Sequence, residues 1–233
     1  MIRIRRSAER GHANHGWLDT FHTFSFAEYH DPEWMGFRTL RVLNEDRVAP
    51  GKGFGTHPHR DMEIVSYVLQ GTLVHRDSAG HGGSLGPGEV QYMSAGKGVL
   101  HSETNGSDRE PLHFVQIWIL PEAKGYVPRY DQRSISGMEE RGRFQLVASP
   151  DGAQRSIPIR QDARVYLSLL VHGEKETFTL PRSRHLWLQV LRGSVDVNGS
   201  ELLAGDGLAA SDAREFALTG LESPVEMLLF DLG

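Results

Sequence analysis

The sequence has no cysteine among its 233 residues. Disulfide bonds, thiolate metal ligands and a cysteine nucleophile are therefore all excluded. Long apolar runs are missing too, and the opening Met-Ile-Arg-Ile-Arg-Arg alternates apolar with basic residues. We accordingly expect no secretory signal and no membrane span, and the cytoplasm is the expected location.

Positive charge is in short supply as well. Lys and Arg total 25 against 30 Asp and Glu, and the formal net charge is −5. This balance gives no support to broad electrostatic binding of nucleic acid, so no such binding is expected. Hydrophobic residues make up 39% and charged residues 24%. These fractions are typical of a soluble globular protein, and the length suffices for one large β domain or two small ones.

Helical periodicity is scarce, and the best short candidate for a helix is residues 134–141. Short apolar runs bounded by Gly, Pro, Asp and Ser instead predict β-strands. The clearest of these runs are residues 63–69, 90–93, 114–120, 165–171, 186–191 and 225–230. The sequence therefore predicts an all-β protein.

The chain resembles itself. Val68-Leu69-Gln70-Gly71 matches Val190-Leu191-Arg192-Gly193 at an offset of 122 residues, and a second glycine turn, at residues 85–89, matches residues 202–206 at an offset of 117. Chance similarity between glycine turns is the alternative. We expect two copies of one β unit, residues 1–130 and 161–233, joined by a linker at residues 131–160.

Two short motifs carry the chemistry: His57-Pro58-His59 and His101-Ser102-Glu103. On an extended strand, residues at i and i+2 point to the same face, so each motif presents two ligand atoms together. Two such strands side by side make a four-ligand cage. Three imidazoles and one carboxylate suit iron(II), manganese, cobalt, nickel, copper or zinc. The alternative is four unrelated polar residues, since the chain has 12 histidines.

Glycines precede both motifs, at residues 51–55 and 96–98, where they allow tight turns and a close approach of the backbone. The internal repeat shows whether the second half of the chain could bind a metal in the same way. Shifting the four candidate ligands by the two offsets leads to Thr179, Pro181, Leu218 and Gly220. None of these can replace the original ligand, so one metal per chain is expected, in the N-terminal half.

The motifs resemble those of a known superfamily. Gly51-x5-His57-x-His59-x3-Glu63 and Gly98-x2-His101-x3-Asn105, with Gly88-x5-Ser94-x-Gly96 between them, look like the two cupin motifs, and the repeat makes the chain similar to a bicupin. More narrowly, residues 57–63 and 94–103 resemble the pirin family, and residues 10–18 and 22–26 resemble its bacterial branch. The likeness spans nearly the whole chain.

The resemblance implies two cupin-type β-barrels with few short helices, and quercetin 2,3-dioxygenase activity. In such a reaction a flavonol is cleaved with O2 and carbon monoxide is released. A small planar polyphenol and O2 would be the ligands, and iron(II) is the expected ion, with Mn, Ni, Co, Cu or Zn as alternatives. The resemblance assigns the metal to His57, His59, His101 and Glu103. The C-terminal barrel would lack metal ligands.

Glu103 is also the expected general base, because a flavonol must lose a hydroxyl proton to bind through adjacent oxygens. One departure concerns Glu63, since seven residues rather than six separate it from Gly71. On a straight strand Glu63 would lie about 13 Å beyond His59. Glu63 therefore competes as fourth ligand only if a turn or bulge brings it back, and otherwise orients an imidazole.

Other residues near the motifs raise further hypotheses. Aromatic side chains could line an apolar substrate cavity or belong to the core, and they are Trp34, Phe37, Phe54, Tyr92, Phe114 and Trp118. His12, His15 and His22 could form a lid or lie on the surface. Two other functions stay open: an iron-binding redox sensor that acts through a protein partner, as some pirins do, and a cupin isomerase or hydrolase.

Overall fold

The computed structural model describes residues 1–135 and 144–233, and it is built from strands. Within those ranges the only helices are two short 3-10 turns, Ser7–Glu9 and Ala153–Arg155. The all-β prediction is thus confirmed. Of the helix candidate at residues 134–141, Ser134 ends a strand, and the part from residue 136 lies outside the described residues.

The chain divides into two compact units. The first is Gly11–Ser136, and the second combines Met1–Arg10 with Gly137–Gly233. Among the described residues, each unit contains one seven-stranded and one four-stranded sheet. The strand pairs in these ranges are antiparallel except β13 with β14.

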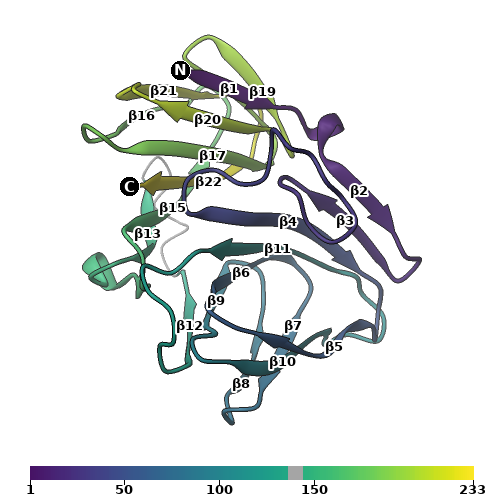
Figure 1. Cartoon of the computed structure of the whole chain (residues 1–233). Coiled ribbons are helices and arrows are strands. Elements are labelled where there is room, and N and C mark those ends of the chain that lie inside the picture. Colours follow the sequence, from purple (N-terminus) through teal and green to yellow (C-terminus); the bar gives the residue numbers. More distant parts are fainter. Residues whose placement is uncertain (136–143) are drawn as a thin grey trace. The chain divides into compact units, whose positions relative to one another are not determined.

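In the first unit the seven-stranded sheet has the order β12-β9-β6-β11-β4-β3-β2, and the four-stranded sheet has the order β5-β10-β7-β8 (Figure 1). Buried side chains from both sheets, among them Val68, Leu73, Leu85 and Phe114, form a core between them. The strands are β2 Gly11–Asn14, β3 Leu18–His22, β4 Leu40–Val48, β5 Gly53–His59, β6 Glu63–Gln70, β7 Leu73–Asp77, β8 Gly82–Leu85, β9 Glu89–Ser94, β10 Val99–Asn105, β11 Leu112–Ile119 and β12 Arg129–Ser134.

The second unit repeats this plan, with sheets of order β1-β20-β17-β22-β15-β13-β14 and β16-β21-β18-β19. An apolar cluster fills the space between its two sheets, including Phe178, Leu188 and Phe216. The strands are β1 Ile2–Arg5, β13 Gln145–Ser149, β14 Ile157–Pro158, β15 Ala163–Leu170, β16 Lys175–Thr179, β17 His185–Arg192, β18 Ser194–Val197, β19 Ser200–Leu203, β20 Gly207–Ser211, β21 Glu215–Gly220 and β22 Val225–Leu232.

The strands coincide with the sequence pattern. All six predicted runs are strands, and β6 and β17 have equal length and start 122 residues apart, at Glu63 and His185. Burial alternates along β10, where Val99, His101, Glu103 and Asn105 are buried and the residues between them are not. A period of two is expected for a strand with one face turned inward. This alternation aims His101 and Glu103 into the unit.

The observed units differ from the expected division at two places. β1 pairs with β20, so residues 2–5 belong with the C-terminal strands. The segment expected as a linker contributes strands to both units, since β12 pairs with β9 and β13 pairs with β15. The sequence missed these boundaries because they depend on pairing between distant strands. A short alternating run indicates a strand but does not say which strand it pairs with. No helix in the described part of the chain is long and apolar enough to cross a bilayer.

Candidate metal centre

Two neighbouring strands of the first unit carry the predicted histidines. β5 and β10 run antiparallel, with His101 directly opposite His57 and Val99 opposite His59. The ring centroids of the three histidines lie 4.4, 4.7 and 4.8 Å apart. Their candidate ligand nitrogens all fall within 4.8 Å of one another. The structure thus gathers three of the four predicted ligands at one point.

Hydrogen bonding fixes which nitrogen of His57 faces its neighbours. Its Nδ1 lies 2.8 Å from the carbonyl oxygen of Gly55, so Nδ1 carries the proton and Nε2 presents a lone pair. That Nε2 lies 3.0 Å from Nε2 of His101. Metal–nitrogen bonds of about 2.0–2.1 Å allow two nitrogens that share one ion to lie roughly 3 Å apart. The spacing therefore fits a shared metal.

His59 gives independent support for an ion. Its Nε2 is buried and has no hydrogen-bond partner in the part of the chain that the structure describes. A buried nitrogen without a partner is unfavourable, and an ion between the three rings would satisfy it. Imidazole nitrogens suit divalent first-row transition ions. The residues present therefore fit a metal site.

Burial keeps two of the imidazoles neutral at neutral pH. Desolvation, followed by repulsion from His57, lowers the pKa of His59 to about 4. Desolvation also lowers the pKa of His101 to about 2, with further contributions from His59 and His57. Neutral imidazole is the form that binds metals, because its second nitrogen keeps a lone pair.

Glu103 lies two residues beyond His101 on the inward face of β10. It is 1% exposed, and with His101 and the buried His75 it forms a second group whose ligand atoms lie within 4.8 Å of one another. Burial raises the pKa of Glu103, while hydrogen bonds from neighbouring side chains act in the opposite direction. Glu103 thus adjoins the histidine triad through His101 and is not itself part of the group with His57 and His59.

A row of polar side chains on the seven-stranded sheet holds Glu103. Ser66 and Gln91 donate hydrogen bonds of 3.1 and 2.9 Å to its Oε1, and Gln116 donates one of 2.6 Å to its Oε2. Strand register aligns these donors, because Ser66 lies opposite both Gln91 and Gln116. The indole of Trp118 donates to Oε1 of Gln116 at 3.0 Å, which turns the amide nitrogen toward Glu103.

Backbone irregularity sets how β5 meets β10. His101 lies opposite His57, whereas Glu103 lies opposite Phe54, so β5 has one extra residue between these pairs. Such a bulge re-aims the side chains on either side of it. A Cβ on Gly53 would lie 2.4 Å from Cα of Thr104. This is the close approach that the glycines at residues 51–55 predict.

Glu63, the competing fourth ligand, lies elsewhere. It begins β6 and is 1% exposed, and its carboxylate accepts hydrogen bonds from the hydroxyls of Tyr92 and Ser94, the latter at 2.6 Å. Neither metal-binding group found among the described residues includes it. The chain does turn between His59 and Glu63, with a positive φ of 49° at Asp61, but the turn leads Glu63 into the seven-stranded sheet.

Sequence reasoning did not single out His75, which is fully buried on β7 opposite Glu103. Its Nδ1 lies 3.4 Å from Nδ1 of His101, and its Nε2 lies 3.7 Å from Oδ2 of Asp77. When Nε2 of His101 faces a metal, its Nδ1 carries the proton and donates to His75. The proton of His75 then faces Asp77. The signal available in the sequence is the spacing of His75 and Asp77, i and i+2, as in the ligand pairs.

We expect His75→Phe to weaken metal binding by roughly 10- to 100-fold, because Nδ1 of His101 loses its acceptor. Phenylalanine preserves the packing, since the His75 ring stacks on Tyr130 with centroids 4.9 Å apart. The metal dissociation constant, measured by competition with a chelator, checks this. His81→Ala is the control, because the exposed His81 contacts the same Asp77 from the other side at 3.0 Å. Equal affinity in His75→Phe and wild type would refute the positioning role.

A cavity of about 290 Å³ lies beside the triad, near the lower end of the range for small-molecule sites. Of the six aromatic candidates, Phe54 and Trp118 line it, whereas Trp34, Tyr92 and Phe114 are buried core residues. Phe37 is partly exposed and is not among the lining residues. The lining residues are His15, Leu18, Thr20, His22, Phe26, Ala27, Asn44, Asp46, Phe54, His57, His59, Glu103, Gln116 and Trp118.

The three N-terminal histidines, His12, His15 and His22, lie in different surroundings. His15 and His22 line the cavity. His12 instead contacts Asp19 at 2.6 Å and stacks on Phe21. The expected lid or surface cluster is therefore divided between the cavity wall and an exposed ion pair.

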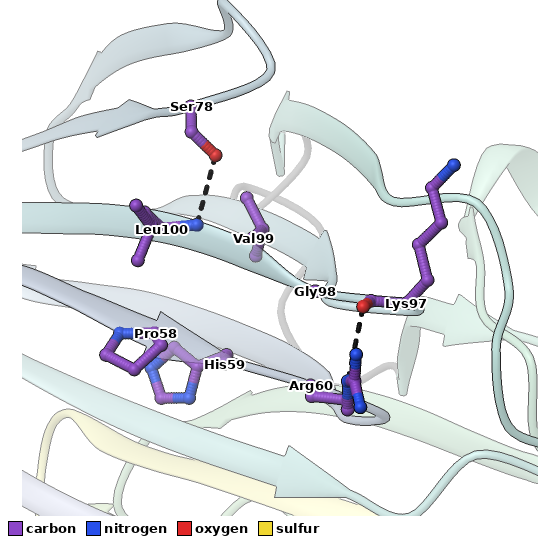
Figure 2. A pocket seen from close by; sticks show the side chains of 8 residues that line it. All are labelled: Pro58, His59, Arg60, Ser78, Lys97, Gly98, Val99 and Leu100. Atoms are coloured by element: carbon purple, nitrogen blue, oxygen red, sulfur yellow. Dashed lines mark hydrogen bonds between the residues drawn. The ribbon is translucent and has the colours of Figure 1, made fainter.

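A second hollow of about 480 Å³ also includes His59. Figure 2 shows two hydrogen bonds between residues of its lining. Arg60 donates to the Lys97 carbonyl oxygen at 3.2 Å, and the Leu100 amide donates to the Ser78 hydroxyl at 3.1 Å. His57, His101 and Glu103 are absent from its lining. The first cavity is therefore the better candidate for a substrate that must reach the triad.

The second unit has no matching centre among its described residues. Both candidate groups belong to the first unit, and neither β16 nor β21 contains a histidine. Leu218, which the repeat aligns with His101, is 1% exposed within the apolar core. Leucines also replace the polar residues that hold Glu103. Leu188, at the position of Ser66, lies opposite both Leu208 and Leu229, as Ser66 lies opposite Gln91 and Gln116.

Two family models match this sequence. The one described as Pirin matches residues 2–119, and the one described as Quercetinase C-terminal cupin domain matches residues 146–232. The chain belongs to the pirin family. The resemblance seen in the motifs is thereby confirmed, as is the bicupin architecture with a pirin-type N-terminal half.

Similar proteins cover the whole chain. A protein named quercetin 2,3-dioxygenase from Escherichia coli (strain K12) is 48% identical over 232 residues, which span 100% of this chain and 99% of that protein. The crystal structure of YhhW from Escherichia coli has a TM-score of 0.96 and 48% identity, covering 100% of this chain and 98% of the other. A second structure, of bacterial pirin YhhW in complex with nickel(II), has a TM-score of 0.94 at the same identity, covering 100% and 99%.

Proposed function

We propose that this chain is a metal-dependent quercetin 2,3-dioxygenase, which cleaves a flavonol such as quercetin with O2 and releases carbon monoxide. The observation that carries the proposal is the histidine triad with a cavity beside it, which His57, His59 and Glu103 help to line. Full-length similarity to a quercetin 2,3-dioxygenase supports it. A small planar polyphenol and O2 are accordingly the proposed ligands, and the cytoplasm is the proposed location.

His57, His59 and His101 would hold the ion, with Glu103 as the fourth ligand. When bound, the metal supplies Lewis-acid and redox chemistry at the adjacent hydroxyl and keto oxygens of the flavonol. Iron(II) is the ion we propose, and Mn, Ni, Co, Cu and Zn suit the same donors. The surrounding wall, with Phe54 and Trp118, excludes water and positions the rings of the substrate.

Glu103 is proposed to take the hydroxyl proton of the flavonol. Its carboxylate has about four lone-pair sites, and hydrogen bonds from Ser66, Gln91 and Gln116 occupy three. One site therefore remains for a metal ion or for the proton. Serving both roles requires that one of these donors, such as Gln116, releases its bond during the reaction.

Oxygen uptake measured together with carbon monoxide release tests the function. We expect quercetin to be consumed with equal losses of O2 and gains of carbon monoxide, using protein loaded separately with iron(II), manganese, nickel or copper. Glu103→Ala should abolish turnover, because both the fourth ligand and the base are removed. Glu63→Ala is the matched control and should keep its metal, since Glu63 bonds to Tyr92 and Ser94 instead.

Three results would contradict this proposal. Loss of metal from Glu63→Ala with retention in Glu103→Ala would exchange the roles of the two glutamates. Metal bound but no O2 consumed with any ion would favour the redox-sensor hypothesis, in which a protein partner is bound without turnover. Turnover of a substrate without O2 would favour the isomerase.

A further inference from the structure

The cavity contains a buried carboxylate that the proposed reaction does not use. Asp46 on β4 lines the cavity and is 4% exposed. The Thr20 hydroxyl donates a hydrogen bond to it, and the charged groups that influence it are the carboxylates Glu103 and Glu45. In the described part of the chain no cation offsets its charge.

A buried carboxylate without a counter-ion is unfavourable for folding. Apart from Glu103, Asp46 is the one carboxylate in the cavity lining given above. It lies on β4 opposite Thr20 and Phe114, two residues beyond Asn44, which lies opposite Gln116 in the row that holds Glu103. Two residues along a strand are roughly 7 Å. Asp46 is therefore offset along the cavity wall from the metal-binding end.

A flavonol bound by its keto and hydroxyl oxygens carries further hydroxyls on its outer rings, away from those two oxygens. The cavity wall includes apolar side chains, among them Leu18, Phe26 and Phe54, against which the outer rings can pack. An apolar wall discriminates weakly against a missing hydroxyl, whereas a buried polar partner discriminates strongly, because the partner is left unsatisfied. Asp46 is such a partner.

We propose that Asp46 accepts a hydrogen bond from a phenolic hydroxyl of the bound flavonol, away from the metal, and so selects polyphenols that carry this hydroxyl. The inference rests on the proposed function, because it assumes that a flavonol occupies the cavity. No covalent bond changes and no proton needs to move.

The protonation state of Asp46 does not alter this role. Desolvation raises its pKa to about 7, aided by Glu103 and Glu45 and opposed by the Thr20 hydrogen bond. Both forms are therefore present near neutral pH. A carboxylate and the carbonyl oxygen of a carboxylic acid can each accept a hydrogen bond from a phenol.

Flavonol binding under argon provides the test, because it needs no turnover. Quercetin is compared with analogues that each lack one hydroxyl of an outer ring. The readout is the quenching of tryptophan fluorescence in metal-loaded protein, to which Trp118 in the cavity contributes. Wild type should bind one analogue about tenfold more weakly than quercetin. Asp46→Val, which keeps the side-chain size but lacks an acceptor, should bind both equally. Asp46→Asn should retain part of the discrimination.

Glu45→Gln is the matched control, because Glu45 is the neighbouring carboxylate on β4 and pairs with Arg47 and His113 instead. It should rank the analogues as wild type does. If Asp46→Val also ranks them as wild type does, the inference is overturned while the proposed function stands. If wild type binds no flavonol, both fail. Should Asp46→Val not fold, Asp46→Ala decides, since it also lacks an acceptor and undiminished discrimination there overturns the inference.

Discussion

His101→Ala is expected to lose its bound metal and to lower flavonol-dependent O2 uptake by more than about a hundredfold, beyond the effect of removing an outer-shell partner. His101 belongs to both ligand groups. Its Nε2 faces His57 and its Nδ1 faces His75. Removing this ring takes away the one residue that the group of His57 and His59 shares with the group of His75 and Glu103. Metal content by mass spectrometry and O2 uptake by electrode are the two measurements.

The control is His185→Ala in the second unit. The repeat aligns His185 with Glu63, and its Nδ1 hydrogen-bonds the Ser211 hydroxyl at 2.8 Å. It should keep full metal content and activity. His101→Ala with one metal per chain would show that the ion is held elsewhere.

Asp46→Asn is expected to stabilise the metal-free protein at pH 8 and to leave its stability nearly unchanged at pH 4. Burial raises the pKa of Asp46 in the folded state to about 7, against the ordinary value of 3.8 for an aspartate in water. Between these two pH values the unfolded chain releases the proton and the folded chain keeps it. The free energy of unfolding therefore falls as pH rises from 4 to 7, by roughly 4 kcal/mol at most.

Glu103 and Glu45 interact electrostatically with Asp46, so the informative quantity is the difference in unfolding free energy between variant and wild type at each pH. Denaturant unfolding after treatment with a chelator gives this difference. Asp108→Asn is the control, because the Asp108 side chain is 89% exposed, and it should not gain the stability that Asp46→Asn gains at pH 8. An equal effect of Asp46→Asn at pH 4 and pH 8 would mean that Asp46 is charged throughout.

Local pattern accounts for much of the site. Strand parity alone pairs His57 with His59 and His101 with Glu103, and the structure puts both pairs on strands that lie side by side. The repeat likewise predicts that the second unit has no ligands, and Leu218 in the core there agrees. These features need only a period of two and a fixed offset, both of which can be read from neighbouring residues.

What the sequence did not reveal depends on pairing between distant strands. Gln116 and Ser66 meet Glu103 because β11 pairs with β6 in one particular register. His75 reaches His101 because β7 pairs with β10. Neither register has a local signal, since a strand's own alternation is the same whichever strand lies beside it.

The row of Gln91, Ser66 and Gln116 has a leucine counterpart, Leu208, Leu188 and Leu229, at the same places in the second unit. Copying the four ligands into the second unit would therefore leave a buried carboxylate among leucines, which cannot donate hydrogen bonds to it. A transplant would have to carry seven positions from five strands. The two units therefore differ in this whole set of positions, and not in the metal ligands alone.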